Sequence, residues 1–127
     1  MFKERRKHHR LATELHATFR VMAGVAGHYI SEPLPATVQS LSELGCCLAL
    51  EDDVAQGLDL ACILAHPESH PLDLTVRAPG GDWHLVALAR WAGAVAEGRA
   101  GGCRVGAVFS PLGGLPPNWR RIVGLLP

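Results

Sequence analysis

Hydrophobic and polar residues alternate along most of the chain. From Leu11 to Val21 the odd positions carry Leu, Thr, Leu, Ala, Phe and Val, whereas the even positions include Glu14, His16 and Arg20. Successive side chains of a strand point to opposite faces, so a period of two indicates one buried face and one solvated face. This segment is therefore predicted to be a half-buried β-strand.

The same pattern recurs further along the chain, with glycine and proline between the segments. These two residue types interrupt strands and favour turns. Residues 22–34, 79–82 and 97–102 are therefore predicted to form loops or turns. Strands are predicted over 36–41, 46–50, 58–65, 72–78, 83–96 and 103–109.

Only the end of the chain has a helical pattern. Pro117 suits a first helical turn, and apolar residues then follow at helical spacing: Trp119, Ile122, Val123 and Leu126. Gly124 lowers the intrinsic helix propensity. This helix is therefore expected to need packing against the rest of the domain, with Trp119 as its anchor.

Short strands with frequent turns indicate a small all-β fold, an antiparallel barrel or sandwich. The chain has 127 residues, of which 48% are hydrophobic, and this fits one globular domain. The expected organisation is a basic arm over 1–10, a β-barrel over 11–110 and a C-terminal helix over 116–126.

Charge is balanced in total but not along the chain, which has 12 basic and 12 acidic residues. Residues 1–10 hold five basic residues and one acidic residue, a net charge of +4; the remaining seven basic and eleven acidic residues give −4. Such an arm concentrates positive potential for an anionic partner, although a solvated tail is the alternative interpretation. There is no apolar run of about 18 residues and no apolar segment after the first basic residues, so neither a membrane span nor a secretory signal is predicted, and a cytoplasmic location is expected.

The cysteines and histidines do not form a metal-binding pattern. The four cysteines, Cys46, Cys47, Cys62 and Cys103, contain no Cys-x-x-Cys pair, and we expect structural thiols in a reducing compartment. His66 and His70 are four residues apart, but two prolines make their segment a loop. The chain also lacks a P-loop, a Gly-x-Ser-x-Gly motif and a His-Glu-x-x-His motif, so no enzymatic activity is expected.

Two short segments combine residues suited to an anionic nucleotide. The segment Arg5-Arg6-Lys7-His8-His9-Arg10 contains the pattern Arg-x-x-x-Arg. The segment Ser40-Leu41-Ser42-Glu43-Leu44-Gly45 follows after one predicted strand, and Arg90-Trp91 and Arg104-Val105-Gly106-Ala107-Val108-Phe109 lie near the end of the strand series.

In order and spacing, these motifs resemble the PilZ domain, a bacterial receptor for cyclic di-GMP. The family pattern is Arg-x-x-x-Arg on an N-terminal arm, then Asp/Asn-x-Ser-x-x-Gly on the barrel, and the resemblance covers nearly the whole chain. It implies a six-stranded antiparallel β-barrel with a flexible arm. It also implies a non-enzymatic receptor without a cofactor, whose arm changes conformation on binding cyclic di-GMP and which signals to a partner protein.

The resemblance implies a cyclic di-GMP site formed by Arg5, Arg6, Arg10, Ser40, Ser42 and Gly45. Arginine binds guanine O6 and N7 or a phosphate with two hydrogen bonds, and it stacks on a flat base. By resemblance, Arg6 and Arg10 would hold the ligand against the barrel, and an arginine at position 5 is associated with a stacked ligand pair. Ser42 would give its hydroxyl to a phosphate oxygen, and Gly45 would allow a close approach of the backbone because it lacks Cβ.

Position 40 departs from the family pattern, because Ser40 replaces Asp or Asn. A carboxylate accepts hydrogen bonds from both N1–H and N2–H of guanine, whereas a hydroxyl is shorter and a weaker acceptor. Losing such a contact costs about 0.5–1.5 kcal/mol, or up to about 3 for a charged acceptor, which is roughly 2-fold to 150-fold in affinity. Gln39 is adjacent but is predicted to point to the opposite face of its strand.

Other interpretations remain open from the sequence alone. Ser42 and Gly45 also suit an ordinary turn, while Trp91 is expected in the core and Arg90 and Arg104 on the outer face. One alternative function is a PilZ-like interaction module that does not bind cyclic di-GMP. A nucleic-acid-binding barrel is the weaker alternative, because the body is acidic and the chain has few aromatic residues to stack on bases.

Overall fold

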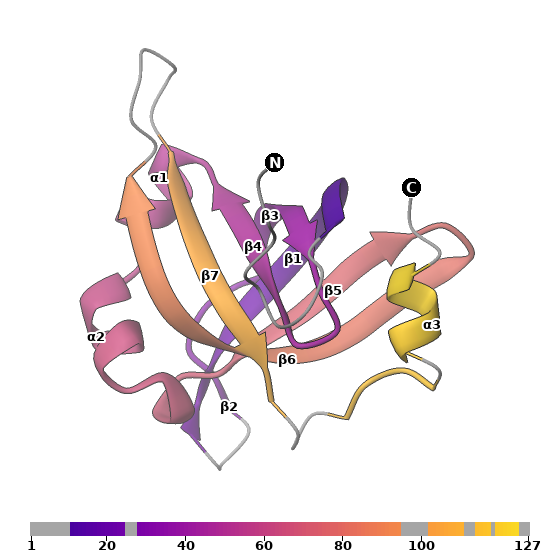
Figure 1. Ribbon diagram of the computed structural model, residues 1–127. Coiled ribbons are helices and arrows are strands. Elements are labelled where there is room, and N and C mark those ends of the chain that lie inside the picture. The colour runs from indigo at the N-terminus through magenta and orange to yellow at the C-terminus, as the bar shows by residue number, and fades with distance from the viewer. Residues whose placement is uncertain (1–10, 25–27, 95–101, 111–113, 118, 125–127) are drawn as a thin grey trace, which may run out of the picture.

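The long first strand organises the barrel in the computed structural model, which describes residues 11–24, 28–94, 102–110, 114–117 and 119–124. β1 (Leu11–Ala23) pairs with β3 (Leu34–Leu41) along one edge and with β5 (Leu72–Ala78) along the other. The remaining strands connect these two, in the order β3–β4–β7–β6–β5, and every neighbouring pair is antiparallel. The six strands therefore close into a ring (Figure 1). The three strands not yet given bounds are β4 (Gly45–Leu50), β6 (Gly81–Ala94) and β7 (Cys103–Phe109).

This ring confirms the predicted all-β class and the antiparallel six-stranded barrel. Six of the seven predicted strands are present, with ends shifted by a few residues. The predicted loop over 22–34 contains one short additional strand, β2 (His28–Tyr29), which pairs with the end of β1. The turn predicted at 79–82 is a hairpin in which Ala78 pairs with Gly81, whereas residues 95–101 lie outside the described residues.

The strand predicted over 58–65 is wrong, because this segment is helical. α1 (Asp52–Gln56) and α2 (Leu60–Ala65) follow β4, and a 3₁₀ helix, Pro67–Ser69, leads into β5. Asp59 caps α2, since its side chain accepts a hydrogen bond from the backbone N–H of Cys62. Val54 of α1 and Ile63 of α2 are buried, so both helices pack against the barrel core.

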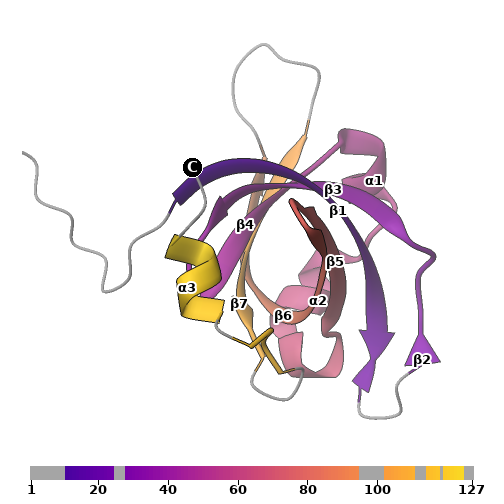
Figure 2. The same cartoon turned by 90° about the vertical axis from the view of Figure 1, so that its right-hand side faces the viewer.

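The inner face of the barrel carries the apolar residues of the alternating pattern. The largest fully buried side chains include Phe19, Leu41, Leu48, Leu74 and Leu85, which come from five different strands. Figure 2 shows these strands curving round the enclosed interior, with α3 and β2 on opposite sides of the view. Each such side chain gains about 1.5–3 kcal/mol from burial, so the core is the main source of stability.

Bulges interrupt the alternation at three places. The register shifts between Ala89 and Trp91 of β6, and Trp91 consequently lies on the outer face with 46% of its surface exposed. The expectation that Trp91 belongs to the core is therefore wrong. Arg90 and Arg104 are exposed, as predicted.

The C-terminal helix, α3 (Trp119–Gly124), is shorter than the predicted 116–126 within the described residues. Trp119 is 5% exposed and packs edge-on against Trp83, at 5.1 Å between ring centroids, and against Phe109, at 5.6 Å. Edge-to-face pairs of this kind are favourable beyond the area that they bury. The prediction that Trp119 anchors this helix is confirmed. None of the helices in the described ranges is long and apolar enough to cross a membrane.

Candidate ligand-binding site

The turn that joins β3 to β4 is built around the hydroxyl of Ser42. The backbone N–H of Ser42 donates to the carbonyl oxygen of Gly45 at 2.9 Å. The Ser42 Oγ accepts from the N–H groups of Leu44 at 3.3 Å and Gly45 at 3.2 Å, and it lies 3.3 Å from the Gly45 carbonyl oxygen, to which it donates. Ser42 is only 3% exposed, so its hydroxyl stabilises the turn itself. Donation to a phosphate oxygen stays a prediction.

Gly45 is required because β7 approaches it closely. A Cβ at this position would lie 2.2 Å from the carbonyl oxygen of Ala107 and 3.1 Å from the Cα of Val108. Both atoms belong to the backbone of β7, and Gly45 pairs with Val108 in the sheet. Gly45 therefore makes room for the neighbouring strand. A close approach to the ligand at Gly45 stays a prediction.

The same turn is attached to the C-terminal helix. The Trp119 Nε1–H donates to the backbone carbonyl oxygen of Glu43 at 3.1 Å. The Arg120 Nε–H donates to the Glu43 carboxylate at 2.6 Å, in an ion pair whose arginine is largely exposed. Because exposed ion pairs contribute little, the indole hydrogen bond and the buried rings of Trp119 provide most of this attachment.

Ser40 lies at a different place, in a hollow of about 460 Å³ on the outer face of the barrel. Among the residues that the structure describes, those lining this outer hollow are Glu14, Gln39, Ser40, Cys47 and Arg104. A second bulge, between Val38 and Ser40, makes Gln39 the extra residue of β3 relative to β4. The expectation that Gln39 faces away from Ser40 is wrong for this reason, since both residues line the outer hollow.

The register of β1 and β3 brings the start of the barrel to Ser40. Ala12 is the partner of Ser40 in this pairing. Arg5, Arg6 and Arg10 lie outside the described residues. The described chain begins at Leu11, which pairs with Leu41, so the first residues of β1 lie beside the outer hollow.

A row of paired residues continues from Ser40 across the barrel wall to Trp91. Ser40 pairs with Cys47, Cys47 with Gly106, and Gly106 with Trp91. A Cβ on Gly106 would lie 2.1 Å from the Trp91 Nε1, so the indole rests directly on this glycine. Sequence reasoning missed this exposed ring because a bulge leaves no clear mark in the pattern. The glycine within the strand pattern of β7 was the available signal.

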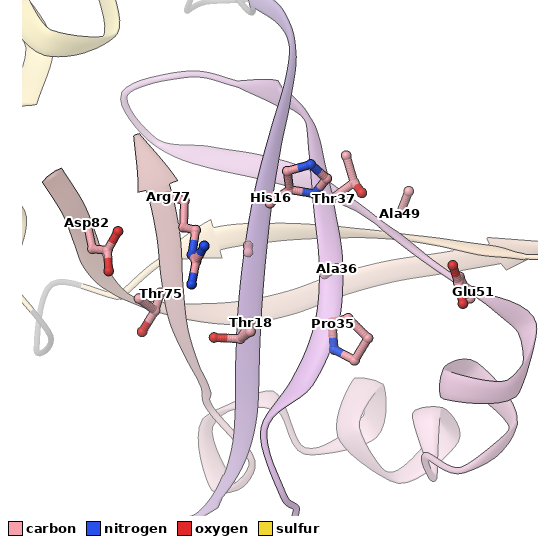
Figure 3. Close-up of a pocket in the computed structure, with 11 residues that line it drawn as sticks. His16, Thr18, Pro35, Ala36, Thr37, Ala49, Glu51, Thr75, Arg77 and Asp82 are labelled. Atoms are coloured by element: carbon pink, nitrogen blue, oxygen red, sulfur yellow. The ribbon is translucent and has the colours of Figure 1, made fainter. Parts of the chain in front are cut away.

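A larger hollow, of about 540 Å³, lies on the neighbouring outer face. Figure 3 shows its side chains on both sides of β1, with His16 and Thr37 on one side and Arg77 and Asp82 on the other. Of the predicted site residues that the structure describes, none lines this larger hollow. Its size alone gives no reason to prefer it over the outer hollow, which holds Ser40 and lies beside the start of β1.

Titratable groups elsewhere form small local contacts. Tyr29 donates a hydrogen bond to Asp73 Oδ2 at 2.7 Å, and this bond, followed by the negative charge of Asp73, raises the pKa of Tyr29 above 10.0. The Cys62 Sγ lies 3.3 Å from the His70 Nε2. Within the described part of the chain, no three His, Cys, Asp or Glu residues are grouped so that they suit a metal ion.

Comparisons with known proteins identify the fold. Neither a scan against protein-family models nor a search of curated proteins gives a match. Among solved structures, the PilZ domain of YcgR from Escherichia coli with c-di-GMP has a TM-score of 0.55 at 16% identity, covering 95% of this chain and 87% of that one. The inhibitor of motility MotI/DgrA from Bacillus subtilis has a TM-score of 0.62 at 15% identity, covering 95% and 48%. PlzA from Borreliella burgdorferi, in complex with c-di-GMP, has a TM-score of 0.57 at 15% identity, covering 94% and 49%.

The chain spans about half the length of MotI/DgrA and of PlzA, and nearly all of the YcgR PilZ domain. The likeness extends over almost the whole chain although few residues are identical. It agrees with the closed ring of six antiparallel strands. In its fold, this chain is a PilZ-like domain.

Proposed function

We propose that this chain is a non-enzymatic receptor for cyclic di-GMP. The observation that carries the proposal is the pairing of Ala12 with Ser40, because it joins an arm of net charge +4 to the rim of a polar hollow on a PilZ-like barrel. Cyclic di-GMP has two phosphodiester groups and two guanines, and arginine side chains suit both. The c-di-GMP complexes of the YcgR PilZ domain and of PlzA support the choice of ligand.

The site combines residues of the arm and of the barrel. Arg6 and Arg10 bind the phosphates and guanine edges, and Arg5 takes part in stacking. Ser40 lines the outer hollow beneath them. Ser42 and Gly45 contribute mainly by fixing the shape of the turn. The Ser42 hydroxyl makes hydrogen bonds within the turn, and Gly45 lies against β7.

Residues 1–127 act as one domain in this proposal, with the arm over 1–10, the barrel over 11–110 and the helix over 116–126. Ligand binding folds the arm onto the barrel and so presents a new surface to a partner protein in the bacterial cytoplasm. No cofactor takes part, because binding by ionic contacts and stacking needs none.

Calorimetric titration with cyclic di-GMP at moderate salt tests the proposal. Arg6→Ala and Arg10→Ala should each weaken binding by tenfold or more, because each removes a charge-assisted contact. Arg77→Ala is the matched control, since Arg77 is an exposed arginine on β5 outside the outer hollow. Neither heat nor chemical-shift changes up to high micromolar ligand would refute the function.

One observation favours a second candidate, a PilZ-like interaction module that does not bind the nucleotide. Ser40 stands at the position where the family carries Asp or Asn. Ser40→Asp separates the two candidates when each variant is titrated with cyclic di-GMP. A wild type that does not bind, together with a variant that does, indicates a damaged site; binding by both proteins supports the receptor.

A further inference from the structure

The outer hollow contains a carboxylate that the sequence motif does not include. Glu14 is exposed on β1 and lines the same hollow as Ser40. It follows Ala12, the partner of Ser40, by two residues. Because Glu14 and Ser40 line the same hollow, one ligand bound there can contact both side chains.

Two irregularities of the sheet bring these residues together. The pairing of β1 with β3 shifts between Ala12 and Leu15, and the pairing of β3 with β4 shifts between Val38 and Ser40. Bulges of this kind redirect side chains and are frequent beside binding sites. Here they gather Glu14 and Gln39 around Ser40 on one face.

The charged groups of the outer hollow are available to a ligand. Neither the Glu14 carboxylate nor the Arg104 guanidinium has a hydrogen-bond or ion-pair partner among the residues that the structure describes. The base guanine offers donors at N1–H and N2–H and acceptors at O6 and N7. A carboxylate accepts hydrogen bonds from N1–H and N2–H, and a guanidinium donates hydrogen bonds to O6 and N7.

We propose that Glu14 supplies the guanine-binding carboxylate that position 40 lacks. The inference rests on the proposed function, because it names the residue of that site which reads the base. Glu14 accepts from N1–H and N2–H of one guanine, and Arg104 lies beside the same base at O6 and N7. Ser40 then leaves room for the longer glutamate side chain from the neighbouring strand.

The test compares two cyclic dinucleotides on the whole chain by calorimetry. Cyclic di-IMP lacks the 2-amino group of guanine, so it offers one donor where cyclic di-GMP offers two. We expect the wild type to prefer cyclic di-GMP, and Glu14→Gln to lose about tenfold to a hundredfold in affinity for it. The preference between the two ligands should shrink in the same variant.

The control is Glu32→Gln, which removes an exposed glutamate outside the outer hollow and should leave both affinities unchanged. Glu14→Gln should melt at the wild-type temperature, because the carboxylate has no partner to lose. Equal binding of cyclic di-GMP by Glu14→Gln and the wild type would overturn the role of Glu14 and leave the receptor function intact. A wild type that binds neither ligand would overturn both.

A double-mutant cycle gives a second measure. Ser40→Asp should raise affinity at least tenfold in the Glu14→Gln background and by less than threefold in the wild type, where two carboxylates would compete for one guanine edge and repel each other. Equal gains in both backgrounds would show that the two positions act independently and would overturn the proposal.

Discussion

The substitution Gly45→Ala tests whether the glycine of the motif is needed for the fold itself. The added Cβ would lie 2.2 Å from the carbonyl oxygen of Ala107, a distance that ordinary contacts exceed by about 1 Å. The obstacle is the backbone of β7, so β4 and β7 must separate at the Gly45–Val108 pair. A shift of about 1 Å takes a hydrogen bond of about 2.9 Å beyond bonding distance.

The expected cost combines overpacking with lost pairing. Overpacking in a tight site costs about 1–3 kcal/mol, and each lost hydrogen bond costs about 1 kcal/mol more. A gain of about 0.4–1 kcal/mol from the less flexible unfolded chain opposes these terms. We therefore expect Gly45→Ala to lower the free energy of unfolding by about 3 kcal/mol, measured by urea unfolding with circular dichroism.

Gly106→Ala is the matched control, because it makes the same change one strand away. Its Cβ meets the indole of Trp91, which is a half-exposed side chain that can turn outwards. We expect a loss of about 1 kcal/mol and a red shift of the Trp91 fluorescence. A Gly45→Ala variant within 1 kcal/mol of the wild type, or more stable than Gly106→Ala, would refute the reasoning.

Three further outcomes are expected. The pKa of Tyr29, the single tyrosine of the chain, is raised chiefly by the hydrogen bond to Asp73. The stability that this hydrogen bond provides is therefore present below pH 10, and it is lost as the pH rises through the raised pKa. Absorbance at 295 nm should show a lower midpoint in Asp73→Asn, and an unchanged midpoint would contradict this cause. Ser42→Ala should lose about 1–3 kcal/mol in urea unfolding, because the part-buried N–H of Leu44 and the buried N–H of Gly45 lose their acceptor. Wild-type stability would show that the hydroxyl is dispensable. Trp119→Phe keeps an aromatic ring but removes the donor to the Glu43 carbonyl. The free energy of unfolding should fall by about 1 kcal/mol, and amide exchange in the turn should become faster. Unchanged exchange would show that this hydrogen bond does not hold the turn.

The strands could be predicted because burial on one face of a barrel imposes a period of two. Leu85, Ala87 and Ala89 are all buried, as their spacing requires. The strand prediction over 58–65 failed because its apolar residues also fit a helix, and the N-cap at Asp59 favours the helix. A helix cap is a single residue, so an analysis of hydrophobic periodicity does not detect it.

The candidate site could be predicted only in part. Ser42 and Gly45 were correctly assigned to one turn, since side-chain capping and close approach leave marks in the sequence. Gln39 and Trp91 were assigned to the wrong faces, and Glu14 was not considered for the site. All three lie within or beside bulges, where one extra residue reverses the alternation on which face assignments depend.

The attachment of Glu43 to Trp119 makes the turn and the C-terminal helix a single mechanical unit. A ligand that displaced the turn would also displace the helix. Otherwise it would have to break the hydrogen bond from Trp119 Nε1 to Glu43 and loosen the cluster of Trp83, Phe109 and Trp119. A displacement of the turn that kept these contacts would therefore also move α3. A dye placed at Arg121, which faces solvent on α3, would turn that movement into an optical signal without entering the hollow.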